Sequence, residues 1–206
     1  MLVAIKQDGR ALAHASDKLK ANREIVMEAV NQTGWALDYA SADLLADRDF
    51  MLEVVKQDGN ALDYASPALK GDREIVLAAV KQNGWALRYA AIALKADREF
   101  VKEAVKQNGY ALEYASAELR GNIEKSDLDY ENKMQKSKEV VLEAVKQNGN
   151  ALKYASDELK GDQEVVLEAV KRDKSALQYA LAELKADRDF MLAAVIQNGM
   201  ALYYAS

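Results

Sequence analysis

Apolar positions along the chain follow a helical pattern that begins again every 25 residues. In the stretch from Asp72 to Gly84, the apolar residues form a single stripe on one face of a helix: Ile75, Val76, Ala79 and Val80. Asp72 is a favourable N-cap, and Glu74 places a negative charge in the first turn, where the helix dipole favours it. We therefore predict one helix per copy, ended by a left-handed glycine such as Gly84.

Two shorter elements complete each copy. A second helix is predicted directly after the glycine, because four residues again share one face: Ala86, Leu87, Tyr89 and Ala90. A single capped turn follows, as in residues 66–71. There Ser66 is the cap, Pro67 occupies the first helical position, and Gly71 closes the turn.

The dipeptide Ala-Leu marks the repeat. It begins at eight alanines: Ala11, Ala36, Ala61, Ala86, Ala111, Ala151, Ala176 and Ala201. Every step is 25 residues except one of 40, which is one period plus 15 extra residues. A copy this small cannot bury its apolar stripe alone, so the copies must stack to form a core. The sequence thus predicts an all-α protein, an α-solenoid wound as a right-handed superhelix, with one continuous repeat array over residues 1–206.

The signature Gln-Asn-Gly-x-Ala-Leu-x-Tyr-Ala-Ser stands at residues 107–116, 147–156 and 197–206, and recurs with changes in the other copies. It resembles the tandem helical repeats catalogued as domain of unknown function 4116, which occur in bacteria, including intracellular pathogens, and in some protists. The resemblance covers the chain apart from the 15 extra residues. It implies a repeat architecture, is compatible with a secreted-effector setting, and implies no activity or catalytic residue.

Composition narrows the class of protein. The formal charge of −5 argues against a nucleic-acid partner, which normally meets a basic face. No apolar run approaches about 18 residues, so no membrane span is expected, and the apolar start at residues 1–5 is too short for a signal peptide. Because cysteine is absent, neither a disulfide nor a thiolate metal site is available. We expect a soluble chain whose compartment the sequence leaves unknown.

One position of each copy holds a ring, which is a histidine in the first copy and a tyrosine in the others: His14, Tyr39, Tyr64, Tyr89, Tyr114, Tyr154, Tyr179 and Tyr204. The tyrosines either form a ladder presented to a ligand or pack between copies with one partner for each hydroxyl. We favour packing, because a residue that serves the stack must be the same in every copy. His14 is the only histidine, so we expect it to replace a ring rather than act as a base or metal ligand.

Two positions of the second helix vary between copies and are the better candidates for partner binding. The residue after the glycine and the residue three further on share a face, and repetition of that face makes a stripe. The candidates in this stripe are aromatic, charged or flexible: Trp35, Asp38, Trp85, Arg88, Tyr110, Glu113, Met200 and Tyr203. Tryptophan, tyrosine and arginine are enriched at binding hot spots. The first interpretation is that these residues bind a partner. The second is that each aromatic ring covers the edge of a neighbouring copy, and both interpretations stay open here.

The pattern is interrupted in two copies. Residues 122–137 contain the highly charged insertion, for which we expect either a surface loop or a short helix. A helix there would be anchored against the stack by three residues: Leu128, Tyr130 and Met134. In the seventh copy Lys174 replaces the glycine and Leu181 replaces the capping serine. We expect either a strained left-handed turn at Lys174 or a continuous bend without it.

Paired carboxylates recur at the starts of helices: Asp47/Asp49, Asp72/Glu74 and Asp187/Asp189. Helix capping accounts for these pairs, and no phosphate loop, nucleophile motif or zinc spacing is present. We therefore expect no enzymatic activity, no metal and no cofactor. The leading hypothesis is a non-enzymatic scaffold that binds a protein or peptide along the variable stripe.

The alternative function is a structural spacer or targeting module of a larger protein, such as an effector. The chain begins inside a first helix and stops before a capped turn, so it lacks the polar capping copies of a free-standing array. This predicts an excerpt of a longer array, or head-to-tail self-association through the uncapped ends.

Overall fold

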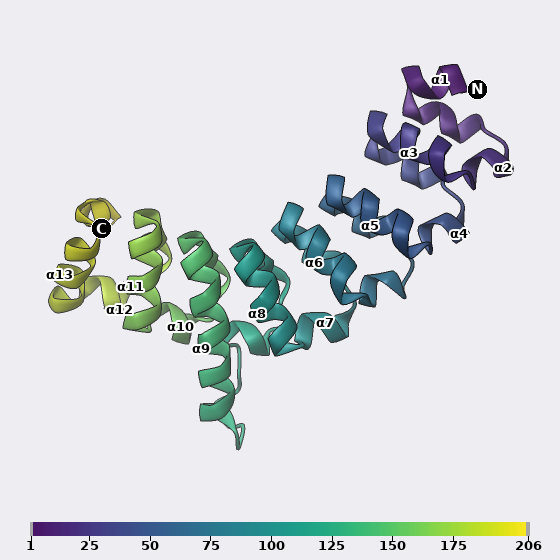
Figure 1. Ribbon diagram of the computed structural model, residues 1–206. Coiled ribbons are helices and arrows are strands. Elements are labelled where there is room, and N and C mark those ends of the chain that lie inside the picture. The colour runs from purple at the N-terminus through teal and green to yellow at the C-terminus, as the bar shows by residue number, and fades with distance from the viewer. Residues whose placement is uncertain (1, 205–206) are drawn as a thin grey trace. The chain divides into compact units, whose positions relative to one another are not determined.

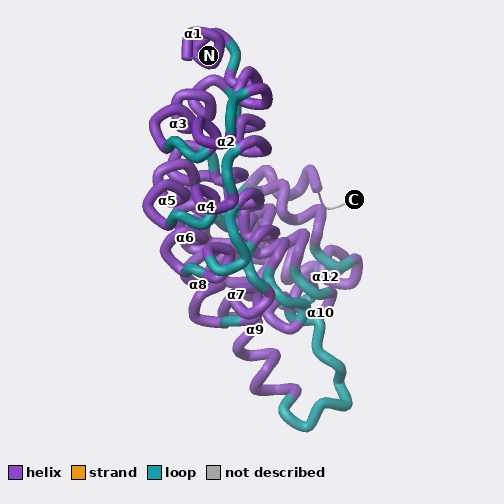
Figure 2. Tube along the Cα trace, turned by 90° about the vertical axis from the view of Figure 1, so that its right-hand side faces the viewer, coloured by secondary structure: helices purple, strands orange, loops and turns teal. Residues whose placement is uncertain are grey.

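The computed structural model describes residues 2–204, and every regular element within them is a helix. A full copy consists of an α-helix, a six-residue 3-10 helix and a short third turn, in that order (Figure 1). Figure 2 shows only helices and connecting loops over the described residues. The prediction of an all-helical protein built from repeated helical units is confirmed.

The elements repeat with the period of the sequence. The α-helices that carry the apolar stripe are α1 (Leu2–Gln7), α3 (Arg23–Gln32), α5 (Arg48–Gln57), α6 (Arg73–Gln82), α8 (Arg98–Gln107), α9 (Tyr130–Gln147), α11 (Gln163–Arg172) and α13 (Arg188–Gln197). The 3-10 helices are η1 (Gly9–His14), η2 (Gly34–Tyr39), η3 (Gly59–Tyr64), η5 (Gly84–Tyr89), η6 (Gly109–Tyr114), η8 (Gly149–Tyr154), η9 (Lys174–Tyr179) and η10 (Gly199–Tyr204). The third turns are α2 (Asp17–Lys20), α4 (Ala42–Leu45), η4 (Leu69–Gly71), α7 (Ile92–Ala96), η7 (Glu118–Arg120), α10 (Asp157–Lys160) and α12 (Ala182–Ala186).

The chain divides into two compact units, residues 1–91 and residues 92–206. In the first unit, α1 packs on α3 and α5 packs on α6. In the second unit, α8, α9, α11 and α13 stand side by side, each in contact with the next (Figure 1). Inside each unit a copy therefore meets mainly the copies next to it in the sequence, as stacked repeats do.

The predicted apolar stripe forms the core. In the fourth copy the buried residues are those of the pattern: Ile75, Val76, Ala79, Val80, Ala86 and Leu87. The predicted cap is also present, because the carboxylate of Asp72 accepts hydrogen bonds from the backbone N–H groups of Glu74 (3.0 Å) and Ile75 (3.1 Å). The core of each unit is thus a row of small layers, one per copy, and every layer depends on its neighbours for burial.

The glycines after the α-helices are not left-handed, so that prediction was wrong. Each α-helix ends one residue earlier, at an extended residue such as Asn83 (φ −145°, ψ 110°), and Gly84 begins the 3-10 helix η5. Among the described residues, only Gly121 has a positive φ, of 93°. The strained turn at Lys174 is therefore absent, and so is a continuous bend. Instead Lys174 begins η9 after the extended Asp173, as glycine does in the other copies.

In four copies glycine is needed at this position because the backbone of the next copy approaches very closely. A Cβ atom added at Gly59 would lie 2.3 Å from the carbonyl oxygen of Ala79. The equivalent atom would lie within 2.6 Å of a carbonyl oxygen of the next copy at three further glycines: Gly9, Gly109 and Gly149. A side chain there would force the copies apart, so these glycines set the spacing between copies.

Consecutive copies are also joined by backbone hydrogen bonds. The N–H group that starts each third turn donates to the carbonyl oxygen that ends the previous one: Ser41 to Lys20 (2.9 Å), Ser66 to Leu45 (3.0 Å), Ser116 to Lys95 (2.8 Å) and Ser156 to Arg120 (2.8 Å). Leu181, which replaces the serine, keeps the same bond to Lys160 (3.1 Å) because only its backbone is used.

Ion pairs reinforce the same contacts. The first helical residue of one copy pairs with the cap and first turn of the next, as Arg48 does with Asp72 (2.8 Å) and Glu74 (2.5 Å). In the second unit, Lys138 makes the equivalent pairs with Asp162 (2.7 Å) and Glu164 (2.8 Å). These side chains are partly exposed, so each pair contributes modestly to stability.

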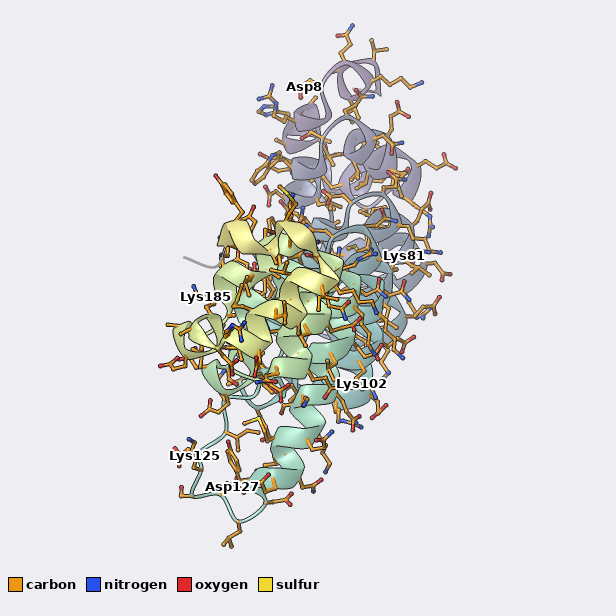
Figure 3. All side chains as sticks on the ribbon, turned by 90° about the vertical axis from the view of Figure 1, so that its left-hand side faces the viewer. Asp8, Lys81, Lys102, Lys125, Asp127 and Lys185 are labelled. Carbon is orange, nitrogen blue, oxygen red and sulfur yellow. The ribbon has the colours of Figure 1, made fainter. Side chains whose placement is uncertain are left out.

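The insertion extends an existing helix instead of forming a separate one. Residues 122–129 form a loop, and α9 begins inside the insertion at Tyr130 and continues unbroken to Gln147. The buried Ser137 ties α9 to η7, since its hydroxyl oxygen lies 2.6 Å from the carbonyl oxygen of Glu118. Figure 3 shows Lys125 and Asp127 on the loop, beyond the packed helices of the second unit.

Candidate functional site

The variable stripe of the first unit lies on η2 and η5. Trp35 is 69 % exposed and Trp85 is 49 % exposed, and Asp38 and Arg88 are exposed three residues further along the same helices. The guanidinium of Arg88 lies over the ring of Tyr89, 4.5 Å from its centroid. On each of these two 3-10 helices, both variable side chains are therefore exposed.

The second unit uses the same positions differently. Tyr110 and Glu113 are half-buried on η6, and Glu113 is bonded to the hydroxyl of Tyr154. Burial, together with this hydrogen bond, raises the pKa of Tyr154 to about 12. Here a variable residue joins the packing between copies.

Met200 and Tyr203 are exposed on η10. Tyr203 stacks edge-on against Tyr204 with the ring centroids 5.4 Å apart. Leu192 and Ile196 of α13 are exposed as well, which makes this last copy more apolar on its surface than the others. The outermost chain ends, Met1 and residues 205–206, lie outside the described residues.

The insertion residues do not form the expected anchor as a group. Leu128 is fully exposed, because it lies in the loop before α9, so the prediction that it packs against the stack was wrong. Tyr130 and Met134 are half-buried on the first turns of α9. The polar contact of Ser137, which the sequence pattern did not single out, holds this part of the helix instead.

Between two pairs of copies, a side-chain hydrogen bond joins the surfaces of neighbouring 3-10 helices. The residue after the glycine of one copy bonds to the residue before the glycine of the next. The amide of Asn83 donates to the side-chain oxygen of Asn60 (2.8 Å), and the amide of Asn150 donates to Asp173 (2.7 Å). These bridges leave little room between the copies that they join.

The second and third copies depart from this arrangement. Trp35 stands where the bridging asparagine stands in the third copy, and Val54 replaces the alanine found five residues before the glycine in every other copy. A Cβ atom added at Gly34 would meet no carbonyl oxygen and only the Oδ2 atom of Asp58, at 3.6 Å. The two copies are therefore spaced more widely at Gly34, since the methyl groups of Val54 need room that alanine leaves free.

A groove of about 550 Å³ opens at this place. We call it the Trp35 groove and define it by its lining residues: Val30, Asn31, Thr33, Gly34, Trp35, Leu37, Val54, Gln57, Asp58, Asn60, Ala61, Asp63, Tyr64 and Tyr89. All of them belong to the first unit. The volume lies within the range of about 300–1,000 Å³ that is typical of ligand pockets.

The Trp35 groove combines an apolar floor with aromatic and acidic walls. Leu37 and Val54 in the floor are fully buried, whereas the ring of Trp35 is largely exposed. Burial raises the pKa of the Tyr64 hydroxyl, and the carboxylates of Asp38 and Asp63 raise it further. Three carboxylates act on this tyrosine, because Asp58 contributes as well, so the groove has a negative electrostatic environment.

Several groove residues were missed at the sequence level. Tyr64 and Tyr89 had been assigned to packing, and Asp58 had no assigned role. The sequence nevertheless contains two signals. Val54 is the only valine at its position, and Thr33 is the only threonine at a position that is otherwise aspartate or asparagine. The hydroxyl of Thr33 makes no cap hydrogen bond, in contrast to Asp58 in the next copy, which accepts from the N–H group of Asn60 (2.9 Å).

The paired carboxylates, which were the other candidates for catalysis or metal binding, act as N-caps of helices. Asp47 accepts from the N–H group of Phe50 (2.7 Å), and Asp187 accepts from that of Phe190 (3.0 Å), so these carboxylates are caps. His14 is exposed at the end of η1. Within residues 2–204 no group of three or more potential ligand residues is placed to hold a metal ion. Nor does that part of the chain contain a helix with the length and apolar character needed to cross a membrane.

These features define an all-helical tandem-repeat protein. The chain matches the family described as "Domain of unknown function (DUF4116)" over residues 1–45, 47–95, 72–120, 137–185 and 162–206. It therefore belongs to this family, as the signature around its glycines indicated. No curated protein matches the chain, and no solved structure does.

Proposed function

We propose that this protein is a non-enzymatic scaffold, a soluble right-handed α-solenoid, that binds a segment of a protein partner in the Trp35 groove. The observation that carries the proposal is the groove itself. It has the volume of a ligand pocket, a buried apolar floor and an exposed tryptophan at its edge. An extended peptide suits it, because the lining is shared by neighbouring copies and so runs across the surface between them and not inside one copy.

The groove is pre-formed by substitutions in the core. Val54 is fully buried, so the separation of the two copies is maintained by packing and does not require a partner. A pre-formed site avoids part of the cost of ordering on binding. The proposal assigns no catalytic step to the chain, since its paired carboxylates are used as helix caps.

Selection of peptides from a random-sequence pool on the full chain tests this function. The affinity of the selected peptides is then measured for the Trp35→Ala and Trp85→Ala variants. Trp85→Ala is the control, because it removes the other tryptophan, which does not line the groove. We expect affinity to fall about tenfold or more for Trp35→Ala and by less than about twofold for Trp85→Ala. Peptides that bind both variants as tightly as the parent would overturn the proposal, provided that circular dichroism shows both variants folded.

A spacer or targeting module of a larger protein is the second candidate. The repeated contacts between copies support it, because the backbone bonds at Ser41 and Ser66 and the ion pairs of Arg48 hold successive copies in a fixed relation. This role needs no groove. Activity of a longer parent protein that survives Trp35→Ala but fails when one 25-residue copy is deleted would favour the spacer.

A further inference from the structure

The charges that line the Trp35 groove are all of one sign. Its titratable residues other than tyrosines are Asp58 and Asp63, and no lysine or arginine is part of the lining. Asp38 adds a third carboxylate close enough to act on Tyr64. Two basic side chains lie beside lining residues: Lys70, whose Nζ atom is 3.9 Å from Asp63, at the limit of an ion pair, and Arg88, which lies over the ring of Tyr89. A cationic occupant is therefore favoured over a neutral or acidic one.

The chain already contains examples of the contact that such an occupant would make. In two copies the residue before the tyrosine is basic and lies over its ring: Arg88 over Tyr89 at 4.5 Å, and Lys153 over Tyr154 at 5.6 Å. In the third copy this position is Asp63, so Tyr64 has no cation from its own copy. Of the two tyrosines that line the groove, Tyr64 is thus preceded by an acid, whereas Tyr89 is preceded by Arg88.

One carboxylate oxygen in the groove is available for a partner. Oδ1 of Asp58 accepts the capping hydrogen bond from the N–H group of Asn60. Within residues 2–204 no hydrogen bond or ion pair to Oδ2 of Asp58 is recorded, and this atom faces Gly34 across the groove. A guanidinium between the ring of Trp35 and Asp58 would stack on one and donate to the other, which a planar arginine does better than a lysine.

We infer that the Trp35 groove binds an arginine side chain of a basic peptide, with Trp35 and Tyr64 as the aromatic walls and Asp58 as the carboxylate partner. This inference rests on the proposed peptide-binding function and specifies its partner. The groove exceeds the space that one side chain needs, so residues next to the arginine are accommodated on the apolar floor of Leu37 and Val54.

Binding of three matched fluorescent peptides to the full chain tests the inference. The first is a short glycine- and serine-based peptide with two arginines, the second has citrulline at both arginines, and the third has glutamate there. Citrulline keeps the shape and removes the charge. We expect the citrulline peptide to bind about tenfold more weakly than the arginine peptide, and the glutamate peptide not to bind. Affinity for the arginine peptide should fall as salt is raised.

Asp58→Asn supplies the matched protein variant. Asparagine occupies this position and caps the 3-10 helix in other copies, as Asn83 and Asn108 do, so the substitution preserves the local structure. We expect it to weaken the arginine peptide about tenfold. Asp173→Asn removes the same charge from the same position in the second unit and should leave affinity unchanged.

The outcomes separate the inference from the function on which it rests. Equal affinity for the arginine and citrulline peptides, or full affinity in Asp58→Asn, overturns the cation site. If pool-selected peptides lack basic residues and still depend on Trp35, the peptide-binding function stands and only the inference fails. If neither the pool nor the three peptides bind, both are overturned.

Discussion

Gly59 lies against the backbone of the next copy so closely that a Cβ atom would be 2.3 Å from the carbonyl oxygen of Ala79. At the equivalent Gly34, the nearest atom would be a carboxylate oxygen of Asp58 at 3.6 Å, which is an ordinary contact. Two glycines in the same position of the repeat thus differ in their surroundings. The difference marks the place where regular stacking gives way to the groove.

Replacing each glycine by alanine measures this difference directly. Gly59→Ala should destabilise the first unit by about 1–3 kcal/mol, because the methyl group must displace backbone. Gly34→Ala should cost less than about 0.5 kcal/mol, since neither residue has a positive φ and the space is open. Urea unfolding followed by tryptophan fluorescence reports on this unit alone, as Trp35 and Trp85 are the only tryptophans. Equal losses for the two variants would contradict the assigned role of the glycine.

The glycines show what the sequence could and could not predict. Their period gave the number of copies, and the apolar stripe around Val76 and Val80 gave the buried face. The reason for glycine was assigned wrongly, because a left-handed helix end and a close approach of backbone both require glycine and look the same in a sequence. Only the position of the carbonyl oxygen of Ala79 distinguishes the two, and that depends on contacts between residues a full copy apart.

The groove was predicted only in part for a similar reason. Trp35 and Asp38 were identified because they vary between copies. The tyrosines were assigned to packing, which suits Tyr154 with its bond to Glu113 but not Tyr64, which lines the groove. The tyrosine position of the repeat therefore serves packing in one copy and lines the groove in another, and the spacing between copies decides between these roles. That spacing follows from Val54, a conservative change whose effect appears only when two helices are packed together.

Alkaline pH should destabilise the second unit through Tyr154. Its pKa is raised from 10.0 to about 12 by burial and by the hydrogen bond to Glu113. The folded state holds the phenolic proton more tightly than the unfolded state does. The contribution is therefore complete below about pH 10 and is lost as pH rises through about 12. Titration by tyrosinate absorbance should show Tyr154 in a late phase, to which Tyr64, whose pKa is also raised, contributes as well.

Glu113→Gln tests the cause of this shift. The variant should lower the pKa of Tyr154 but leave it above 10.0, since burial, the larger cause, is unchanged. Tyr154→Phe should reduce the amplitude of the late phase by one tyrosine, which identifies the contribution of Tyr154 and leaves that of Tyr64. A late phase that is identical in Glu113→Gln and in the parent would show that the hydrogen bond does not contribute.

The ion pairs between copies should be transferable along the array. Lys138 pairs with Asp162 and Glu164 of the next copy. One copy later, Gln163 occupies the position of Lys138, and Asp187 and Asp189 occupy the positions of the two acids. Gln163→Lys should therefore stabilise the last copies by up to about 1 kcal/mol at low salt, and by less at high salt. Hydrogen exchange of the amides of α13 provides the measurement. A gain that does not depend on salt would point to helix propensity and not to the ion pair.

Deletion of the same two methyl groups at two buried valines should have unequal costs. Val54 and Val80 are both fully buried in the first unit. Val80→Ala should cost about 2 kcal/mol, because it leaves a cavity in a regularly packed layer. Val54→Ala restores the alanine of the other copies and allows α3 and α5 to approach, so it should cost less than about 1 kcal/mol. It should also narrow the groove, which lowers the accessibility of Trp35 to acrylamide and weakens selected peptides. Equal costs with unchanged accessibility of Trp35 would show that Val54 does not hold the groove open.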